Sequence, residues 1–213
     1  MYKVKGYFGH LFKCGEGGEK LIKTKTLQEK GNLSDSMCTF YTIREPELKY
    51  EIYQDAVTRG IAESEYFHKT VSRLCEGLEG RTLVLVERVA HGDALHKMIP
   101  NSIWVSGKDD LESRRYVIEQ LSVSKGKVVA IATNIFNTGV SFHVHNLVNA
   151  AGGAAEHLTQ QRLGRGLRKN ENSLLNYYDF LFLINDYLED HSKKRIKVIE
   201  GEQHEVVVKE IDF

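Results

Sequence analysis

Short apolar runs alternate with helical segments along much of this 213-residue chain, and this alternation restricts its possible folds more than any other feature. The runs lie at residues 82–86, 102–105, 128–132, 146–151 and 176–184. Nearly unbroken apolar runs are typical of strands that are buried on both faces. Residues 90–98 and 110–121, which separate the first three runs, are predicted to be helices. The pattern predicts an α/β fold, with a parallel sheet covered by helices on both faces.

Further elements are expected on either side of these runs. They are a helix at 19–30, a strand at 37–43, helices that begin at Pro46 and at Glu63, and a short strand at 205–208. We expect residues 46–190 to form the domain, residues 1–45 to lead into it and residues 191–213 to be a C-terminal extension. In a parallel sheet of this kind, ligands meet the loops at the carboxyl ends of the strands.

The charge balance and the cysteines narrow the class of protein. The 29 basic and 29 acidic residues cancel, so the chain has no overall field that attracts nucleic acid, and any phosphate binding must be local. The three cysteines are far apart and form no C-x-x-C pair, which favours a reducing compartment and predicts no metal site. No apolar run approaches the ~20 residues of a membrane span. We therefore expect a cytoplasmic protein with no membrane partner.

One basic stretch stands out among the loops. Arg162, Arg165 and Arg168 follow one another at a spacing of three, with Gln161 before them and Gly164 and Gly166 between them. A guanidinium group is always charged, and its planar fork of donors matches phosphate oxygens. No acidic residue follows before Glu171, so these groups need an anionic partner. The alternative is a solvated basic turn.

The loops together resemble a known set of motifs. Residues 132–141, followed by a strand and then by residues 161–168, resemble motifs V and VI of superfamily-two helicases. Residues 83–95 resemble motif IV, and residues 105–107 with Arg114 resemble the element called IVa. Within the superfamily the chain looks most similar to the phage UvsW-type recombination helicases, over nearly its whole length. The resemblance implies a RecA-like helicase C-terminal domain.

The resemblance also implies roles at the nucleotide. Arg165 and Arg168 would be arginine fingers, which stabilise charge at the γ-phosphate during transfer. Gln161 would sense the γ-phosphate, and Arg162 would be structural or interdomain. Gly139, which follows Thr138, would contact the nucleotide. Ser141 stands where the family often has an acidic residue that contacts the ribose, so the chain departs from the family at this position.

Five residues are candidates for binding nucleic acid. By resemblance, Thr133, Gly107 and Arg114 would contact the backbone of DNA, and Arg88 and His91 would lie at the matching rim. Contacts of this kind position a strand without reading its bases. The alternative for Thr133 is that its hydroxyl caps the next helix.

The motifs of a first motor domain do not occur in the sequence. There is no G-x-x-x-x-G-K-[ST], because Gly107-Lys108 precedes two aspartates and Gly126-Lys127 precedes two valines, and there is no D-E-x-[HD] box. ATP and Mg²⁺ would be held mainly by a first RecA-like domain, joined in cis or in trans, with residues 1–45 leading from it. The chain alone is therefore expected to be inactive.

Two smaller features and two rival functions complete the expectations. His143 and His145 are assigned to a solvated loop instead of a metal site. Residues 193–195 are assigned to a solvated helix face, and the alternative is that they add a phosphate contact. The first rival is a stand-alone nucleic-acid-binding or regulatory module without ATPase activity. The second is an unrelated enzyme that grips a small phosphate ester.

Overall fold

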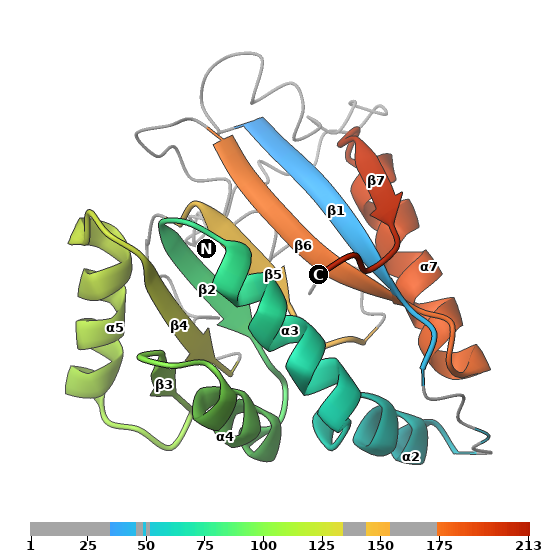
Figure 1. The fold of residues 1–213 in the computed structure, drawn as a ribbon, viewed down its shortest axis with the longest axis horizontal. Helices are drawn as coiled ribbons and strands as arrows, with labels where there is room; N and C mark the ends of the chain where they lie inside the picture. The colour runs from blue at the N-terminus through green and yellow to red at the C-terminus, as the bar shows by residue number, and fades with distance from the viewer. Residues whose placement is uncertain (1–34, 46–48, 50–51, 134–143, 154–173) are drawn as a thin grey trace, which may run out of the picture.

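In the part of the chain that the structure describes, seven parallel strands form a single sheet (Figure 1). The computed structural model describes residues 35–45, 49, 52–133, 144–153 and 174–213. The strands are β1 (Asp35–Ile43), β2 (Arg81–Leu85), β3 (Ile103–Val105), β4 (Val128–Ala132), β5 (Asn146–Asn149), β6 (Leu174–Phe182) and β7 (Val206–Lys209). Their order across the sheet is β3-β4-β2-β5-β6-β1-β7. The predicted parallel α/β architecture is confirmed.

Helices cover both faces of this sheet. They are α2 (Tyr53–Val57), the π-helical turn η1 (Thr58–Ala62), α3 (Glu65–Gly77), α4 (Val89–Met98), α5 (Leu111–Val123) and α7 (Asp186–Gly201). The core on one face joins apolar residues of α2, α3 and α4 to the sheet. The core on the other face joins those of α5 and of the later turns of α7. Figure 1 shows α3 running across the face nearer the viewer.

Strand β2 is buried on both faces of the sheet. Val84 packs into one core, Leu83 and Leu85 pack into the other, and all five residues of the strand are buried. Successive side chains of a strand point to opposite faces, so a strand covered on both faces needs an apolar residue at nearly every position.

Strands β1 and β7 belong to the same sheet. β1 lies between β6 and β7, with Asp35–Ile43 paired along its whole length to Leu174–Phe182. β7 pairs with β1, and α7 crosses residue 190 without interruption. Residues 35–45 and 191–209 are thus structural parts of the same sheet and its covering layer.

The helices between β1 and β2 are more broken than predicted. Pro46 and the helix expected at 19–30 lie outside the described residues. The first described helix begins at Tyr53 and passes into the π-helical turn at Thr58. Ser64 then caps α3 by accepting a hydrogen bond from the Phe67 N–H at 3.2 Å, which starts this helix two residues after the expected Glu63.

Candidate nucleic-acid interface

The carboxyl ends of three neighbouring strands form one part of the sheet edge. β3, β4 and β2 lie side by side, and the register pairs Val105 with Ala132 and Ala132 with Leu85. The loops that leave these strands therefore begin next to one another. They carry Gly107 and Arg114 after β3, Thr133 after β4, and Arg88 and His91 after β2.

Thr133 links the first two loops. Its hydroxyl accepts a hydrogen bond from the Gly107 N–H at 3.1 Å, and its own N–H donates to the Val105 carbonyl at 3.3 Å. The side chain is buried, with 8% of its surface exposed. A hydroxyl that accepts one bond can still donate its proton. The structure thus brings together Thr133 and Gly107, which the sequence separates by 26 residues.

Arg114 completes this group from the first turn of α5. Its Nη2 donates to the Gly107 carbonyl at 2.8 Å, so Gly107 is held through both its N–H and its C=O. The Arg114 Nε is buried and has no acceptor in the part of the chain that the structure describes. Among the same residues the guanidinium makes no ion pair. Gly107, Thr133 and Arg114, called here the edge cluster, therefore combine fixed backbone with a positive charge that makes no direct ion pair with the described residues, although it lies near enough to Asp109 and Asp110 to help lower their pKa.

Two aspartates beside the edge cluster are used by the loop itself. Asp109 accepts from the N–H and the hydroxyl of Ser106 at 2.6 and 2.8 Å, and Asp110 accepts from the Ser113 N–H at 2.7 Å as the cap of α5. These backbone hydrogen bonds lower the pKa of both carboxyls. The aspartates therefore fix the loop and the helix start while Arg114 bonds to the Gly107 carbonyl.

Arg88 turns away from the edge cluster. Its Nη1 donates to the Thr58 hydroxyl at 2.6 Å, and its Nη2 donates to the Gln54 side-chain oxygen at 3.2 Å. Both acceptors are neutral and lie on the α2–η1 segment, so the charge of Arg88 is not cancelled there. Arg88 fastens that segment to the end of β2, and its contact with nucleic acid remains a prediction.

His91 lies inside the protein instead of at the expected rim. The imidazole is 1% exposed and stacks on His68, with ring centroids 4.9 Å apart. Burial, with a smaller contribution from His68, lowers the pKa of His91 to about 3. Its Nε2 has no partner among the described residues. A neutral, covered ring cannot reach a phosphate, so His91 is not part of the surface that we propose below.

The residues expected at the nucleotide are Gln161, Arg162, Arg165, Arg168, Thr138 and Gly139, and all of them lie outside the described residues. The structure does describe the strand that leads toward the arginines. β5 ends at Asn149, and the chain then turns through Gly152 and Gly153, whose φ angles are +67° and +82°. This conformation favours glycine.

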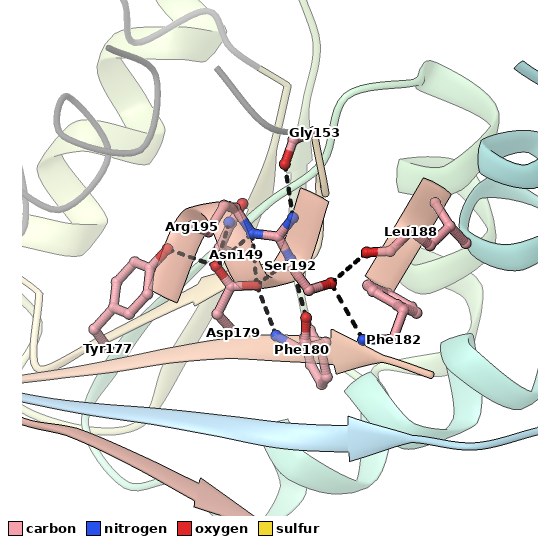
Figure 2. Close-up of polar contacts among 9 residues, drawn as sticks. All are labelled: Asn149, Gly153, Tyr177, Asp179, Phe180, Phe182, Leu188, Ser192 and Arg195. Atoms are coloured by element: carbon pink, nitrogen blue, oxygen red, sulfur yellow. Dashed lines mark hydrogen bonds and ion pairs between the residues drawn. The ribbon is translucent and has the colours of Figure 1, made fainter. Parts of the chain in front are cut away.

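A buried ion pair behind this turn was not predicted, and it corrects the assignment of residues 193–195 to a solvated helix face. Arg195 is 1% exposed and Asp179 is fully buried, and the Arg195 Nη2 donates to Asp179 Oδ1 at 2.8 Å (Figure 2). Burial works against the charge of Arg195, but Asp179 outweighs it and the pKa of the guanidinium is raised. Lys193 and Lys194 are exposed, as expected, and pair with Glu189 and Asp190.

One signal in the sequence could have revealed this pair. Asp179 is the sole charged residue within the apolar run 176–184. A carboxylate at the centre of a buried strand needs a cation, because leaving it unpaired there is costly. The sequence does not say which cation, since Arg195 lies 16 residues away on another element.

The remaining expectations concern metals and membranes. Within the described ranges, no group of three or more metal-ligating side chains comes together. His143 lies outside the described residues. His145 accepts a hydrogen bond from the Arg81 N–H at 3.0 Å through its Nδ1. No helix among the described residues is long and apolar enough to cross a bilayer.

Comparison with known proteins gives relatives of one kind. No protein-family profile matches the chain. The chain is 27% identical over 178 residues to the ATP-dependent DNA helicase UvsW of Enterobacteria phage T4, which covers 78% of this chain and 34% of UvsW. The crystal structure of T4 UvsW matches 84% of this chain and 42% of that one, with a TM-score of 0.68 and 23% identity.

Two further solved structures share the fold. The C-terminal domain of the DEAD-box protein Dbp5 matches 84% of this chain and 93% of that domain, with a TM-score of 0.59 and 15% identity. A fragment of a putative HsdR subunit of a type I restriction enzyme from Vibrio vulnificus matches 87% of this chain and 38% of that one, with a TM-score of 0.67 and 16% identity. At these identities the likeness concerns the fold alone.

The sheet order, the helices on both faces and these matches define the fold class as that of a RecA-like helicase C-terminal domain. Within that class, the sequence similarity shows that the chain is homologous to the T4 UvsW helicase. The chain spans about a third of the length of that relative.

Proposed function

We propose that this chain is the second motor domain of an ATP-dependent DNA helicase that unwinds or remodels branched DNA. It would contribute DNA-backbone contacts and arginine fingers to a motor whose first RecA-like domain binds ATP and Mg²⁺. The homology to UvsW supports a helicase, and the edge cluster is the observation in this chain that supports a role on nucleic acid.

The edge cluster suits a phosphate better than a base. Gly107 carries no side chain to keep a strand at a distance, and Thr133 and Arg114 hold its peptide groups in place. The Arg114 guanidinium supplies a positive charge that a phosphate could pair directly, since Asp109 and Asp110 spend their hydrogen bonds on Ser106 and Ser113. Groups of this kind hold the backbone and give little sequence preference.

The nucleotide side of the proposal rests on the resemblance of the sequence. Arg165 and Arg168 would reach the γ-phosphate of ATP bound by the first domain, with Gln161 sensing that phosphate. Thr138, Gly139 and Arg162 would line the same cleft. By analogy with UvsW, we also propose a role in DNA recombination or repair in the cytoplasm, which is the host cytoplasm for a phage-encoded protein.

Binding of DNA by the isolated chain tests the edge cluster. We expect weak binding whose affinity rises steeply as the salt concentration falls, because phosphate contacts release counterions. Arg114→Ala should lower affinity and reduce the slope of log K against log salt by about one. Arg115→Ala is the matched control, because Arg115 is the exposed neighbour on α5. Salt-insensitive binding, or equal effects of the two substitutions, would contradict the proposed contact.

Reconstitution tests the motor itself. A first motor domain that carries the G-x-x-x-x-G-K-[ST] motif is added in trans, and DNA-stimulated ATP hydrolysis is measured. Stimulation by this chain supports the motor, whereas DNA binding without any stimulation favours the stand-alone module. Turnover of a small phosphate ester without ATP would favour the unrelated enzyme.

A further inference from the structure

Two neutral groups on the helical segment before α3 hold the side chain of Arg88. Its Nη1 donates to the Thr58 hydroxyl at 2.6 Å, and its Nη2 donates to the Gln54 side-chain oxygen at 3.2 Å. Gln54 belongs to α2, and Thr58 is the first residue of the π-helical turn η1. These two hydrogen bonds are called here the Arg88 latch. In the described part of the chain, no carboxylate forms an ion pair with Arg88.

The backbone of Arg88 leaves the sheet beside the edge cluster. β2 ends at Leu85, which pairs with Ala132, and the Val86 N–H donates to the Ala132 carbonyl at 2.9 Å. Arg88 follows Val86 by two residues, and Thr133 of the edge cluster directly follows Ala132. The latch therefore bonds to α2 and η1 a guanidinium whose backbone lies next to the proposed DNA surface.

The acceptors of the latch are weaker partners for Arg88 than a phosphate is. Both hydrogen bonds lie at least partly in solvent, and both acceptor oxygens are neutral. A phosphate carries a full negative charge and accepts two parallel bonds from the planar guanidinium. A phosphate within reach of Arg88 therefore competes favourably with Thr58 and Gln54 for the same N–H donors.

The segment that bears the latch is anchored to the core without it. Residues 60–62 at the end of η1 are buried, whereas Gln54 is exposed and Thr58 is half-buried. The Thr58 hydroxyl also donates to the Gln54 carbonyl at 2.7 Å, and this bond does not involve Arg88. Loss of Arg88 from the latch therefore loosens the exposed side of the junction between α2 and η1 while the buried side stays packed. Short π-helical turns of this kind are frequent at functional sites.

We propose that the Arg88 latch regulates DNA binding at the edge cluster. In the free chain, Thr58 and Gln54 hold the Arg88 guanidinium. When a DNA strand lies on the edge cluster, one of its phosphates takes these donors and the junction between α2 and η1 is released. The inference rests on the proposed function, because it needs a DNA strand at this edge of the sheet. Binding of DNA then raises the hydrogen exchange of the junction instead of protecting it.

Thr58→Val tests the latch through affinity. The variant keeps the shape of the side chain and removes the acceptor, so we expect DNA affinity to rise several-fold. Thr70→Val is the matched control, because the Thr70 hydroxyl makes the same kind of helical bond, to the Tyr66 carbonyl at 3.0 Å, and holds no arginine. Arg88→Ala should weaken binding and reduce the slope of log K against log salt by about one. In that background Thr58→Val should have no effect.

Hydrogen exchange of the whole chain, with and without a forked DNA, tests the release. In the wild type we expect the Thr58 amide, which is bonded within α2, to exchange several-fold faster when DNA is bound. Arg88→Ala should show the faster exchange without DNA, and DNA should then change it no further. Arg59→Ala removes an exposed ion pair with Glu63 from the same turn but keeps the latch, so it should respond to DNA as the wild type does.

Each outcome decides one claim. If DNA binds but leaves exchange of the Thr58 amide unchanged or slows it, the latch is overturned. Equal affinities of Thr58→Val and Thr70→Val, or a gain from Thr58→Val that persists in the Arg88→Ala background, also overturn it. A wild-type chain that binds no DNA overturns the proposed DNA contact, and this regulation with it.

Discussion

Thr133 directly follows β4 and holds the loop after β3, so one hydroxyl orders two loops of the proposed DNA surface. The sequence predicts that the Thr133 hydroxyl contacts a phosphate or caps a helix. The structure adds a hydrogen bond that this hydroxyl accepts from the Gly107 N–H. That bond decides how Gly107 presents its backbone. The residue therefore acts through a glycine that is distant in the sequence.

Substitution of Thr133 separates the hydroxyl from the rest of the side chain. Thr133→Val keeps the shape but leaves the Gly107 N–H without its acceptor, at a cost of about 1 kcal/mol in the free energy of unfolding. We expect DNA affinity to fall several-fold as Gly107 loses its fixed orientation. Thr133→Ser retains the hydroxyl and should restore binding in a fluorescence anisotropy titration. Equal affinities of the valine and serine variants would contradict this role.

His91 makes stability depend on pH. Burial lowers the pKa of His91 to about 3, whereas an unfolded histidine has a pKa near 6.5. Between these values the unfolded chain binds a proton that the folded chain does not. The contribution of His91 to the free energy of unfolding is therefore fully present above about pH 6.5. It decreases as the pH falls toward about 3, by about 1.4 kcal/mol per pH unit.

Urea unfolding at pH 7.5 and pH 5.0 measures this dependence. His91→Leu should reduce the loss of stability between the two pH values by about 2 kcal/mol. His68 also has a lowered pKa from burial and keeps part of the dependence in that variant. An identical pH dependence in His91→Leu and wild type would rule out the buried neutral ring.

At the scale of elements, α4 approaches β3 through a glycine. A Cβ on Gly92 would overlap the indole ring of Trp104, and the same ring donates its Nε1–H to Asp93 at 2.8 Å. The helix therefore lies closer to the strand than any other residue would allow. This contact sets how far α4 stands from the edge of the sheet that carries Gly107.

Two helical glycines make a matched pair for testing this contact. Gly92→Ala should lower the free energy of unfolding by about 1–3 kcal/mol, because the overpacked ring must move. Gly77→Ala, at an exposed position with nothing near the added Cβ, should raise it by up to about 1 kcal/mol through helix propensity. Thermal melts of both variants measure the difference, and two changes of the same sign would be inconsistent with close packing at Gly92.

The elements also show how far the sequence could be interpreted. β2 and β4 were predicted within a residue, because burial on both faces favours apolar residues at most positions. The contribution of β1 to the sheet was not predictable, because its partners β6 and β7 are far along the chain. The burial of His91 was missed for the same reason, since its cover comes from Phe67 and His68 on α3.

At the scale of the whole molecule, the chain would offer one side of the proposed motor. The edge cluster supplies groups suited to a DNA backbone, and the segment beyond Gly153 carries the arginines proposed for ATP. The sequence has neither the phosphate cradle nor the acidic box of a first motor domain, which hold ATP and Mg²⁺ in such motors. In the proposed motor, the two domains would therefore meet across a cleft for hydrolysis.

The central claim is that Arg165 and Arg168 act on ATP held by another domain. The most direct measurement is the DNA-stimulated kcat of the reconstituted motor with Arg165→Ala, beside Arg115→Ala as the control and with thermal melts to confirm folding. We predict negligible hydrolysis by the chain alone, and in the reconstituted motor a fall in kcat of about 10³-fold or more for Arg165→Ala only. Rapid hydrolysis by the chain alone, or an unchanged kcat in folded Arg165→Ala, would contradict the claim.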